Sequence, residues 1–268
     1  MKRVLITGCS SGMGKTTALF LHEQGFEVYA ATRTPHTLDS YSCETFHPLF
    51  LDITNSENTA AIIKKIPRID ILVNNAGYGL VSTVEDVTEA EMKAQFDVNL
   101  FGLLRVTKAV IPKMREQKSG IIINISSFLG KIGLPLLTFY NASKYAVEGV
   151  TDSLRYELRE FNIRVHSIMP GFFDTNFARD NLVVNEKIFS KESPYAELAD
   201  TLAPQIIEQI NHGNDPLWVA ETIYKIIEDE NFPARVTAGE KASKFIPMKK
   251  ELSDEDFERR VREYYSLG

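Results

Sequence analysis

The 268-residue sequence is poor in cysteine, and its two cysteines, Cys9 and Cys43, form neither a CxxC pair nor a disulfide framework. Such sparse cysteine is typical of proteins from a reducing compartment. Its five histidines lie at positions 22, 36, 47, 166 and 212, and their spacing matches no metal-ligand motif. We therefore expect no structural disulfide and no bound metal.

Long hydrophobic runs are also lacking, because no apolar stretch approaches the length of a membrane span. The basic residues 2–3 precede an apolar run that stops at Thr7, which is too short for an export signal. The formal net charge of −6 argues against a nucleic-acid partner. These features predict a soluble, cytoplasmic protein with no membrane span and a small-molecule partner.

Short apolar runs alternate with longer amphipathic stretches almost to the end of the chain. This alternation is typical of an α/β protein with a doubly wound parallel sheet covered by helices on both faces. No repeat or linker divides the chain, so one domain over residues 1–268 is predicted, with about seven strands. The expected strands are 4–7, 27–32, 46–51, 69–74, 120–126, 163–169 and 235–238, and the main expected helices are 15–24, 99–117 and 140–161.

The stretch GCSSGMGKTT after the first expected strand is a candidate phosphate-binding loop. A nucleoside-triphosphate loop needs a glycine five positions before Gly14, with four residues between the two glycines, but Cys9 stands there, and its side chain opposes the tight turn. The spacing of Gly8, Gly12 and Gly14 instead favours a dinucleotide loop that opens a helix, whose N-terminus attracts a pyrophosphate. A triphosphatase or kinase remains a less favoured alternative.

The stretch YNASK places Tyr140 and Lys144 one turn apart on a helix face, so the ammonium can favour the phenolate form of the tyrosine. Ser127 lies thirteen positions before Tyr140, at the carboxyl end of an expected strand, where ligands of doubly wound folds gather. Ser126 is the alternative member of this Ser-Ser pair, and the spacing favours Ser127.

These motifs occur with NNAG at residues 74–77, Asn99 in VNLFG, and Pro170-Gly171, in the order typical of the short-chain dehydrogenases/reductases. The chain resembles this family from residue 4 to about residue 240. The segments EVYAATR and NNAGYGL and the tail resemble the branch of 17β-hydroxysteroid and retinol dehydrogenases. The resemblance implies a Rossmann fold and a nicotinamide-dependent oxidoreductase that interconverts a secondary alcohol and a ketone or aldehyde.

The resemblance also implies the role of each catalytic residue. Tyr140 would be the general acid/base, Ser127 would donate to the substrate oxygen, Lys144 would bind the nicotinamide ribose, and Asn99 would hold a water in a proton relay. The residues expected to contact the cofactor are Gly8, Ser10, Ser11, Gly12, Met13, Gly14, Thr32, Arg33, Asp52, Ile53, Asn75, Ala76, Gly77, Tyr140, Lys144, Pro170, Gly171 and Thr175.

The choice between the two nicotinamide cofactors rests on the end of the second expected strand. NAD-binding proteins usually carry an acidic residue there for the ribose 2′-hydroxyl, whereas this chain has Thr32 and Arg33. A guanidinium pairs with a 2′-phosphate, so NADP(H) is predicted over NAD(H). Asp52 and Ile53 flank the adenine by resemblance, although Asp52 could instead cap the helix that follows.

Residues 172–215 form a connection too long to be passive and rich in apolar side chains, so we expect a substrate-side lid and a hydrophobic alcohol or ketone. The alternative is that these side chains only pack the lid. Residues 252–268 predict a docked C-terminal helix. By resemblance, the helices at 99–117 and 140–161 would form a homodimer or homotetramer. A non-catalytic NADP(H)-sensing protein is a further alternative, but it would not need an intact set of Ser127, Tyr140 and Lys144.

Overall fold

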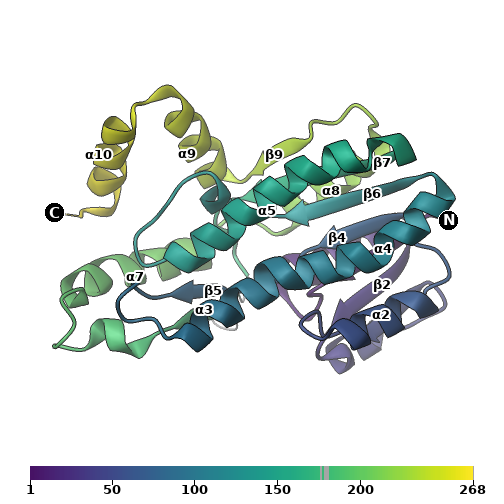
Figure 1. The fold of residues 1–268 in the computed structure, drawn as a ribbon, viewed down its shortest axis with the longest axis horizontal. Helices are drawn as coiled ribbons and strands as arrows, with labels where there is room; N and C mark the ends of the chain where they lie inside the picture. Colours follow the sequence, from purple (N-terminus) through teal and green to yellow (C-terminus); the bar gives the residue numbers. More distant parts are fainter. Residues whose placement is uncertain (176, 178–180, 268) are drawn as a thin grey trace.

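The computed structural model describes residues 1–175, 177 and 181–267. Its main sheet has seven parallel strands in the order β3-β2-β1-β4-β6-β7-β9 (Figure 1). The order reverses between β1 and β4, which is the topological switch point of a doubly wound sheet. The strands are β1 (Arg3–Thr7), β2 (Glu27–Thr32), β3 (Phe46–Phe50), β4 (Ile71–Asn74), β6 (Gly120–Ile125), β7 (Ile163–Pro170) and β9 (Arg235–Ala238).

Helices cover both faces of this sheet, and each face has its own buried apolar cluster. The described α-helices are α1 (Gly12–Glu23), α2 (Ser56–Lys65), α3 (Glu89–Phe96), α4 (Leu103–Gln117), α5 (Thr138–Glu157), α7 (Ala196–Asn211), α8 (Leu217–Glu228), α9 (Glu240–Glu251) and α10 (Asp254–Tyr265). Side chains of α1 and α8 pack on one face of the sheet, and side chains of α2, α4 and α5 pack on the other. The predicted fold class is confirmed.

The apolar pattern placed all seven strands of the main sheet, but the helix starts differ from prediction. The first helix begins at Gly12 rather than at residue 15, and Gly25 ends it with a φ of +85°. The helix predicted over residues 99–117 begins at Glu89, because α3, a π-helical segment (Asp97–Gly102) and α4 follow one another without a break. Thr88 caps its start through a reciprocal capping box with Glu91.

A second, two-stranded sheet was not predicted. It pairs β5 (Gly79–Val81) in parallel with β8 (Leu182–Val184), so residues about one hundred positions apart become neighbours. A short 3₁₀ turn (Glu186–Phe189) and helix α7 follow β8 within the segment predicted as a lid. This small sheet lies beyond the carboxyl end of β4 and forms part of the wall of the site.

The C-terminal residues form a helical pair, α9 and α10, at one end of the molecule (Figure 1). Helix α10 lies within the predicted 252–268 segment, begins at a Ser253 cap, and buries Phe257, Val261 and Tyr265 in a third apolar cluster. That cluster also contains residues of α7 and the end of β7. Among the described residues, no helix is both long enough and apolar enough to cross a bilayer.

Candidate active site

Two loops meet at the switch point between β1 and β4. The Asn75 amide nitrogen donates to the carbonyl oxygens of Thr7 (2.9 Å) and Gly8 (3.2 Å). The Thr7 hydroxyl accepts from the backbone N–H groups of Asn75 (3.0 Å) and Ala76 (3.1 Å). The expected phosphate loop is therefore fixed to the loop after β4 by side chains from both strands.

The glycines of the loop are required by this close approach. A Cβ on Gly14 would lie 2.3 Å from the Gly8 carbonyl oxygen and 2.4 Å from the Asn75 amide nitrogen, which leaves no room for any side chain. Gly8 has a φ of +73°, a conformation that other residues rarely adopt. Ser11, the residue that caps α1, makes no side-chain capping bond. The first-turn N–H groups of α1 therefore fit a pyrophosphate.

The expected cofactor contacts line a single cleft of about 430 Å³, with two exceptions. Pro170 and Gly171 instead line a neighbouring apolar cavity. The expected residues that line the cleft are Gly8, Ser10, Ser11, Gly12, Met13, Gly14, Thr32, Arg33, Asp52, Ile53, Asn75, Ala76, Gly77, Tyr140, Lys144 and Thr175. Dispersed positions in the sequence are thus brought to one edge of the sheet.

The adenosine end of this cleft carries Arg33 and Asp52. Arg33 is exposed and follows the last residue of β2. The Asp52 carboxylate accepts from the Thr54 hydroxyl (2.7 Å) and backbone N–H (3.0 Å), and the hydroxyl bond holds its pKa below the ordinary value. Asn55, not Asp52, caps α2, so the interpretation of Asp52 as the helix cap is wrong.

The Tyr140, Lys144 and Ser127 side chains come together where β6 ends and α5 begins. The Lys144 ammonium donates to the Ile125 carbonyl oxygen (2.9 Å) and lies 5.7 Å from the centre of the Tyr140 ring. Ser127 is buried, and its hydroxyl accepts from the Leu129 N–H (3.1 Å). A hydroxyl, a phenol and an ammonium therefore share one corner of the cleft.

Burial dominates the ionisation of this group. It raises the pKa of Tyr140 to about 12, and a hydrogen bond with Ser127 opposes this rise. Burial also lowers the pKa of Lys144 to about 8, opposed by the negative charge of Glu148. The expected lowering of the Tyr140 pKa by Lys144 is therefore not found in the protein alone, because desolvation of the phenol outweighs it.

Asn99 lies in the π-helical segment, and its side chain is already engaged. Its oxygen accepts from the Tyr78 N–H (3.0 Å), while its nitrogen donates to the Tyr78 carbonyl oxygen (2.9 Å) and the Ser143 hydroxyl (3.1 Å). Gln95 continues this pattern, since its nitrogen donates to the Tyr78 carbonyl and its oxygen accepts from the Leu80 N–H. The Asn99 amide thus anchors the loop that leads into β5, and its water-relay role stays a prediction.

An apolar cavity adjoins the cleft on the substrate side, and the two share Tyr140 in their linings. The other residues that line both are Met13, Ser126, Thr175 and Phe177. Seven residues of the expected lid segment line the cavity, namely Phe172, Phe173, Thr175, Phe177, Leu182, Ile206 and Ile210, together with Ser127, Phe128 and Leu129. Val183 lines the cofactor cleft instead, and Ile188 is buried in the core.

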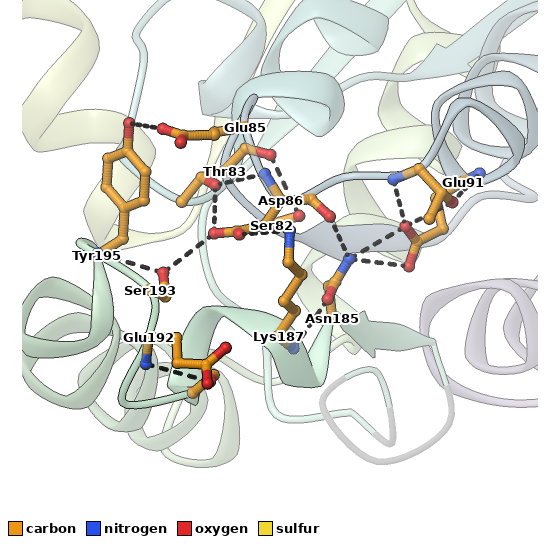
Figure 2. Close-up of polar contacts among 12 residues, drawn as sticks. Ser82, Thr83, Glu85, Asp86, Glu91, Asn185, Lys187, Glu192, Ser193 and Tyr195 are labelled. Carbon is orange, nitrogen blue, oxygen red and sulfur yellow. Dashed lines mark hydrogen bonds and ion pairs between the residues drawn. The ribbon is translucent and has the colours of Figure 1, made fainter.

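The segment after β8 is fastened to the loop after β5 by polar contacts (Figure 2). The buried Asp86 carboxylate accepts from the Ser193 hydroxyl (3.2 Å) and pairs with the Lys187 ammonium (3.2 Å). The Asn185 amide donates to the Asp86 carbonyl oxygen (3.2 Å) and to the Glu91 carboxylate (3.1 Å). These contacts hold this part of the expected lid against the loop after β5, so it forms a fixed wall of the site.

Sequence reasoning did not assign every residue of the site. Asn181 and Val183 lie in the segment expected on the substrate side, but they line the cofactor cleft, because the pairing of β8 with β5 brings them there. Glu148 did carry a signal, since it is an acidic residue one turn after Lys144 on the apolar face of a long helix.

Fold and site together define a nicotinamide-dependent oxidoreductase. A family model for short chain dehydrogenases matches residues 2–183, and the chain belongs to this family. It is 36% identical over 269 residues to a 3-ketodihydrosphingosine reductase of Bacteroides thetaiotaomicron, with 98% of each chain covered. The protein is therefore an oxidoreductase that acts on CH–OH groups with NAD(P).

Solved structures agree with this assignment. A short-chain dehydrogenase from Streptomyces avermitilis superposes with a TM-score of 0.84 at 31% identity, covering 99% of this chain and 98% of that one. The closed form of a serine dehydrogenase complexed with NADP⁺ superposes with a TM-score of 0.72 at 26% identity, covering 88% and 93% of the two chains.

Proposed function

We propose that this protein is an NADP(H)-dependent enzyme that interconverts a secondary alcohol and a ketone, or an aldehyde, on a lipophilic molecule. The observation that carries the proposal is the meeting of a polar dinucleotide cleft and an apolar cavity at Tyr140. A carbonyl carbon held in the cavity beside Tyr140 would face the cleft, while the rest of the substrate would contact apolar side chains.

NADPH, when bound, supplies the hydride that reduces the carbonyl carbon. In that direction Tyr140 gives its phenolic proton to the carbonyl oxygen, and Ser127 donates a hydrogen bond to the same oxygen as negative charge develops on it. Because burial raises its pKa to about 12, Tyr140 is protonated in the cofactor-free protein and ready to act as an acid. Lys144 binds the nicotinamide ribose. Asn99 is assigned the relay water, which a group other than its side-chain amide must hold, because that amide is already bonded to Tyr78 and Ser143.

The preference for NADP(H) follows from Arg33, which lies in the cleft directly after β2, where no acidic residue follows the strand. A guanidinium and a phosphate form charge-assisted hydrogen bonds that contribute about 1.5–3 kcal/mol. Arg33→Asp should therefore weaken NADPH binding by at least about tenfold and shift the preference toward NADH. An unchanged ratio of the two affinities would contradict this assignment.

The substrate class is inferred from the wall of the cavity, in which aromatic and aliphatic side chains predominate. The similarity to a protein named 3-ketodihydrosphingosine reductase supports a lipophilic carbonyl. This relative does not support the expected resemblance to the 17β-hydroxysteroid and retinol dehydrogenase branch, so steroids and retinoids stay in the proposal only as molecules of the same apolar class. Pro170 and Gly171, which line the cavity, are assigned to the boundary between cofactor and substrate.

The quaternary structure and the domain organisation follow the same proposal. Helices α4 and α5 would pair two copies into a homodimer or, in two such pairs, a homotetramer. Phe101, Tyr145 and Tyr156 are exposed apolar side chains on or beside these helices and support this assignment. Residues 1–268 are taken as one domain, and residues 172–215 as its substrate-side segment.

The test is NADPH consumption with a panel of long-chain ketones, steroid ketones and aldehydes. Tyr140→Phe removes the proton donor and should abolish turnover while NADPH still binds. Tyr145→Phe changes an exposed tyrosine on the same helix and should leave turnover unchanged. Turnover that survives in Tyr140→Phe would refute the assigned chemistry. NADPH binding without turnover of any carbonyl would instead support the regulatory, NADP(H)-sensing alternative.

A further inference from the structure

Glu148 is a buried carboxylate that the proposed chemistry does not use. It lies one turn after Lys144 on α5, and it is only 3% exposed. Its carboxylate pairs with the Arg235 guanidinium (2.7 Å) and the Lys131 ammonium (3.2 Å) and accepts a hydrogen bond from the Ser167 hydroxyl. An acid in this setting is retained only with such partners, since burying an unpaired charge is costly.

The Glu148 side chain packs beside Gly130, close to the end of β6 and to the backbone of Lys144. A Cβ on Gly130 would lie 2.8 Å from the Ser126 hydroxyl oxygen, 3.2 Å from Glu148 Cγ and 2.9 Å from the Lys144 carbonyl oxygen. Only a glycine therefore fits between Glu148 and the end of β6. The strand end that leads to Ser127 rests on this packing.

The basic residues around Glu148 come from three different elements. Lys144 lies on the same helix, while Lys131 follows the 3₁₀ turn (Phe128–Gly130) and Arg235 begins β9. Asp152, one turn further along α5, pairs with Arg235 (2.7 Å) but is half-exposed. On α5, Lys144 lies between Tyr140 and Glu148. Among the described residues, Glu148 is the one acid whose charge raises the pKa of Lys144.

We propose that Glu148 is a positioning residue that keeps Lys144 in its charged ammonium form and fixes the strand end carrying Ser127. The inference rests on the proposed function, in which Lys144 binds the ribose of NADP(H). Burial alone favours the neutral amine of Lys144, and the adjacent carboxylate opposes this tendency. Lys131 and Arg235 satisfy the carboxylate and also limit how strongly it acts on Lys144.

This arrangement predicts that substitutions of Glu148 and of Lys131 shift the pKa of Lys144 in opposite directions. Without the negative charge of Glu148, Lys144 should lose its proton at a lower pH. Without the positive charge of Lys131, Lys144 should lose its proton at a higher pH. A purely structural role would loosen the same packing in both variants and would not move the two titrations in opposite directions.

The experiment is NADPH binding, followed by cofactor fluorescence between about pH 7 and pH 10, where the 2′-phosphate is already ionised. Affinity should fall as Lys144 loses its proton. We expect Glu148→Gln to lower the midpoint of that fall, because the negative charge of Glu148 raises the pKa of Lys144. Lys131→Gln should raise the midpoint. Unchanged midpoints, or shifts in the same direction, would overturn the proposal.

Two further measurements keep the outcome interpretable. Asp152→Asn removes a charge from the same cluster without touching Glu148, and its midpoint should stay close to the wild-type value. If Glu148→Gln does not fold, Lys131→Gln carries the test alone, because Lys131 is one-third exposed, and a midpoint that stays or falls would refute the proposal. The binding experiment does not depend on turnover. If only the substrate assignment is wrong, the midpoints will still shift as predicted, but the enzyme will reduce none of the tested carbonyls.

Discussion

Replacing Lys144 with methionine should stabilise the cofactor-free protein while removing its function. Burial lowers the pKa of Lys144 from 10.5 to about 8, a shift of about 2.5 units. Each unit corresponds to about 1.4 kcal/mol, so holding this ammonium in the folded protein at pH 7 costs about 3 kcal/mol. In the proposed mechanism, this charged ammonium binds the nicotinamide ribose beside Tyr140.

Part of the gain is offset by a lost hydrogen bond. The Lys144 ammonium donates to the Ile125 carbonyl oxygen (2.9 Å), and leaving that buried acceptor without a partner costs about 1–2 kcal/mol. The expected net stabilisation of Lys144→Met near pH 7 is therefore about 1–2 kcal/mol. For a chain of this size, that corresponds to a rise in Tm of roughly 4 °C.

The pH dependence gives the sharper test. Between pH 8 and pH 10.5 the unfolded chain holds the Lys144 proton more tightly than the folded protein, so wild-type stability gains from this group as the pH rises. The variant lacks this gain, so its advantage should vanish at about pH 9 and become a deficit of about 1–2 kcal/mol, the lost hydrogen bond to Ile125, as the pH approaches 10.5.

Urea denaturation of both proteins at several pH values measures the difference directly, and all other titrating groups cancel. Lys108→Met, an exposed lysine on α4, serves as the control and should show no such trend. A Lys144→Met protein that is less stable than wild type by the same amount at every pH would refute the reasoning.

Three further predictions concern other parts of the molecule. Gly14→Ala should weaken NADPH binding at least about tenfold in a fluorescence titration, because the added carbon would lie 2.3 Å from the Gly8 carbonyl oxygen; full affinity would contradict the loop assignment. Asp86→Asn should lower the free energy of unfolding by about 1–3 kcal/mol in urea titrations, since it weakens the buried contacts of the segment after β8, whereas Tyr195→Phe at its exposed rim should change little. In native protein a thiol reagent should label Cys43, which is exposed and whose pKa is lowered by a hydrogen bond from the Thr45 backbone, but should reach buried Cys9 only after unfolding. Rapid labelling of both thiols in native protein would contradict this burial.

The parts of this protein that could be predicted from sequence are those set by short-range pattern. Continuous apolar runs place the main strands, and the glycine spacing identifies a loop whose function depends on positions only a few residues apart. The pair Tyr140 and Lys144 is equally local, because helical periodicity alone puts both on one face. Each of these features can be predicted without knowledge of any contact between residues distant in the sequence.

The remainder depends on contacts between distant residues. Strands β5 and β8 have three residues each, too few for a periodic pattern, and they exist because they pair with each other. The engagement of Asn99 with Tyr78 and the desolvation that raises the pKa of Tyr140 are equally non-local. The sequence-based expectation for the pKa of Tyr140 took account of only one neighbour, Lys144. Desolvation of the phenol depends on all the residues that surround it.

The π-helical segment between α3 and α4 constrains how the chain can change in length. A π-helix holds more residues per turn than an α-helix, so one deletion there would let a regular helix form. A π-helical residue turns the chain by less than the roughly 100° of an α-helical residue, so this segment turns it about as far as an α-helix with one residue fewer. The deletion would therefore leave α3 and α4 nearly in phase, and the apolar face of α4 would stay on the sheet. It would instead tighten the backbone around Asn99 and move its amide relative to Tyr78. A change of length in this segment thus acts on the anchor of the loop before β5, while the packing of the two flanking helices is kept.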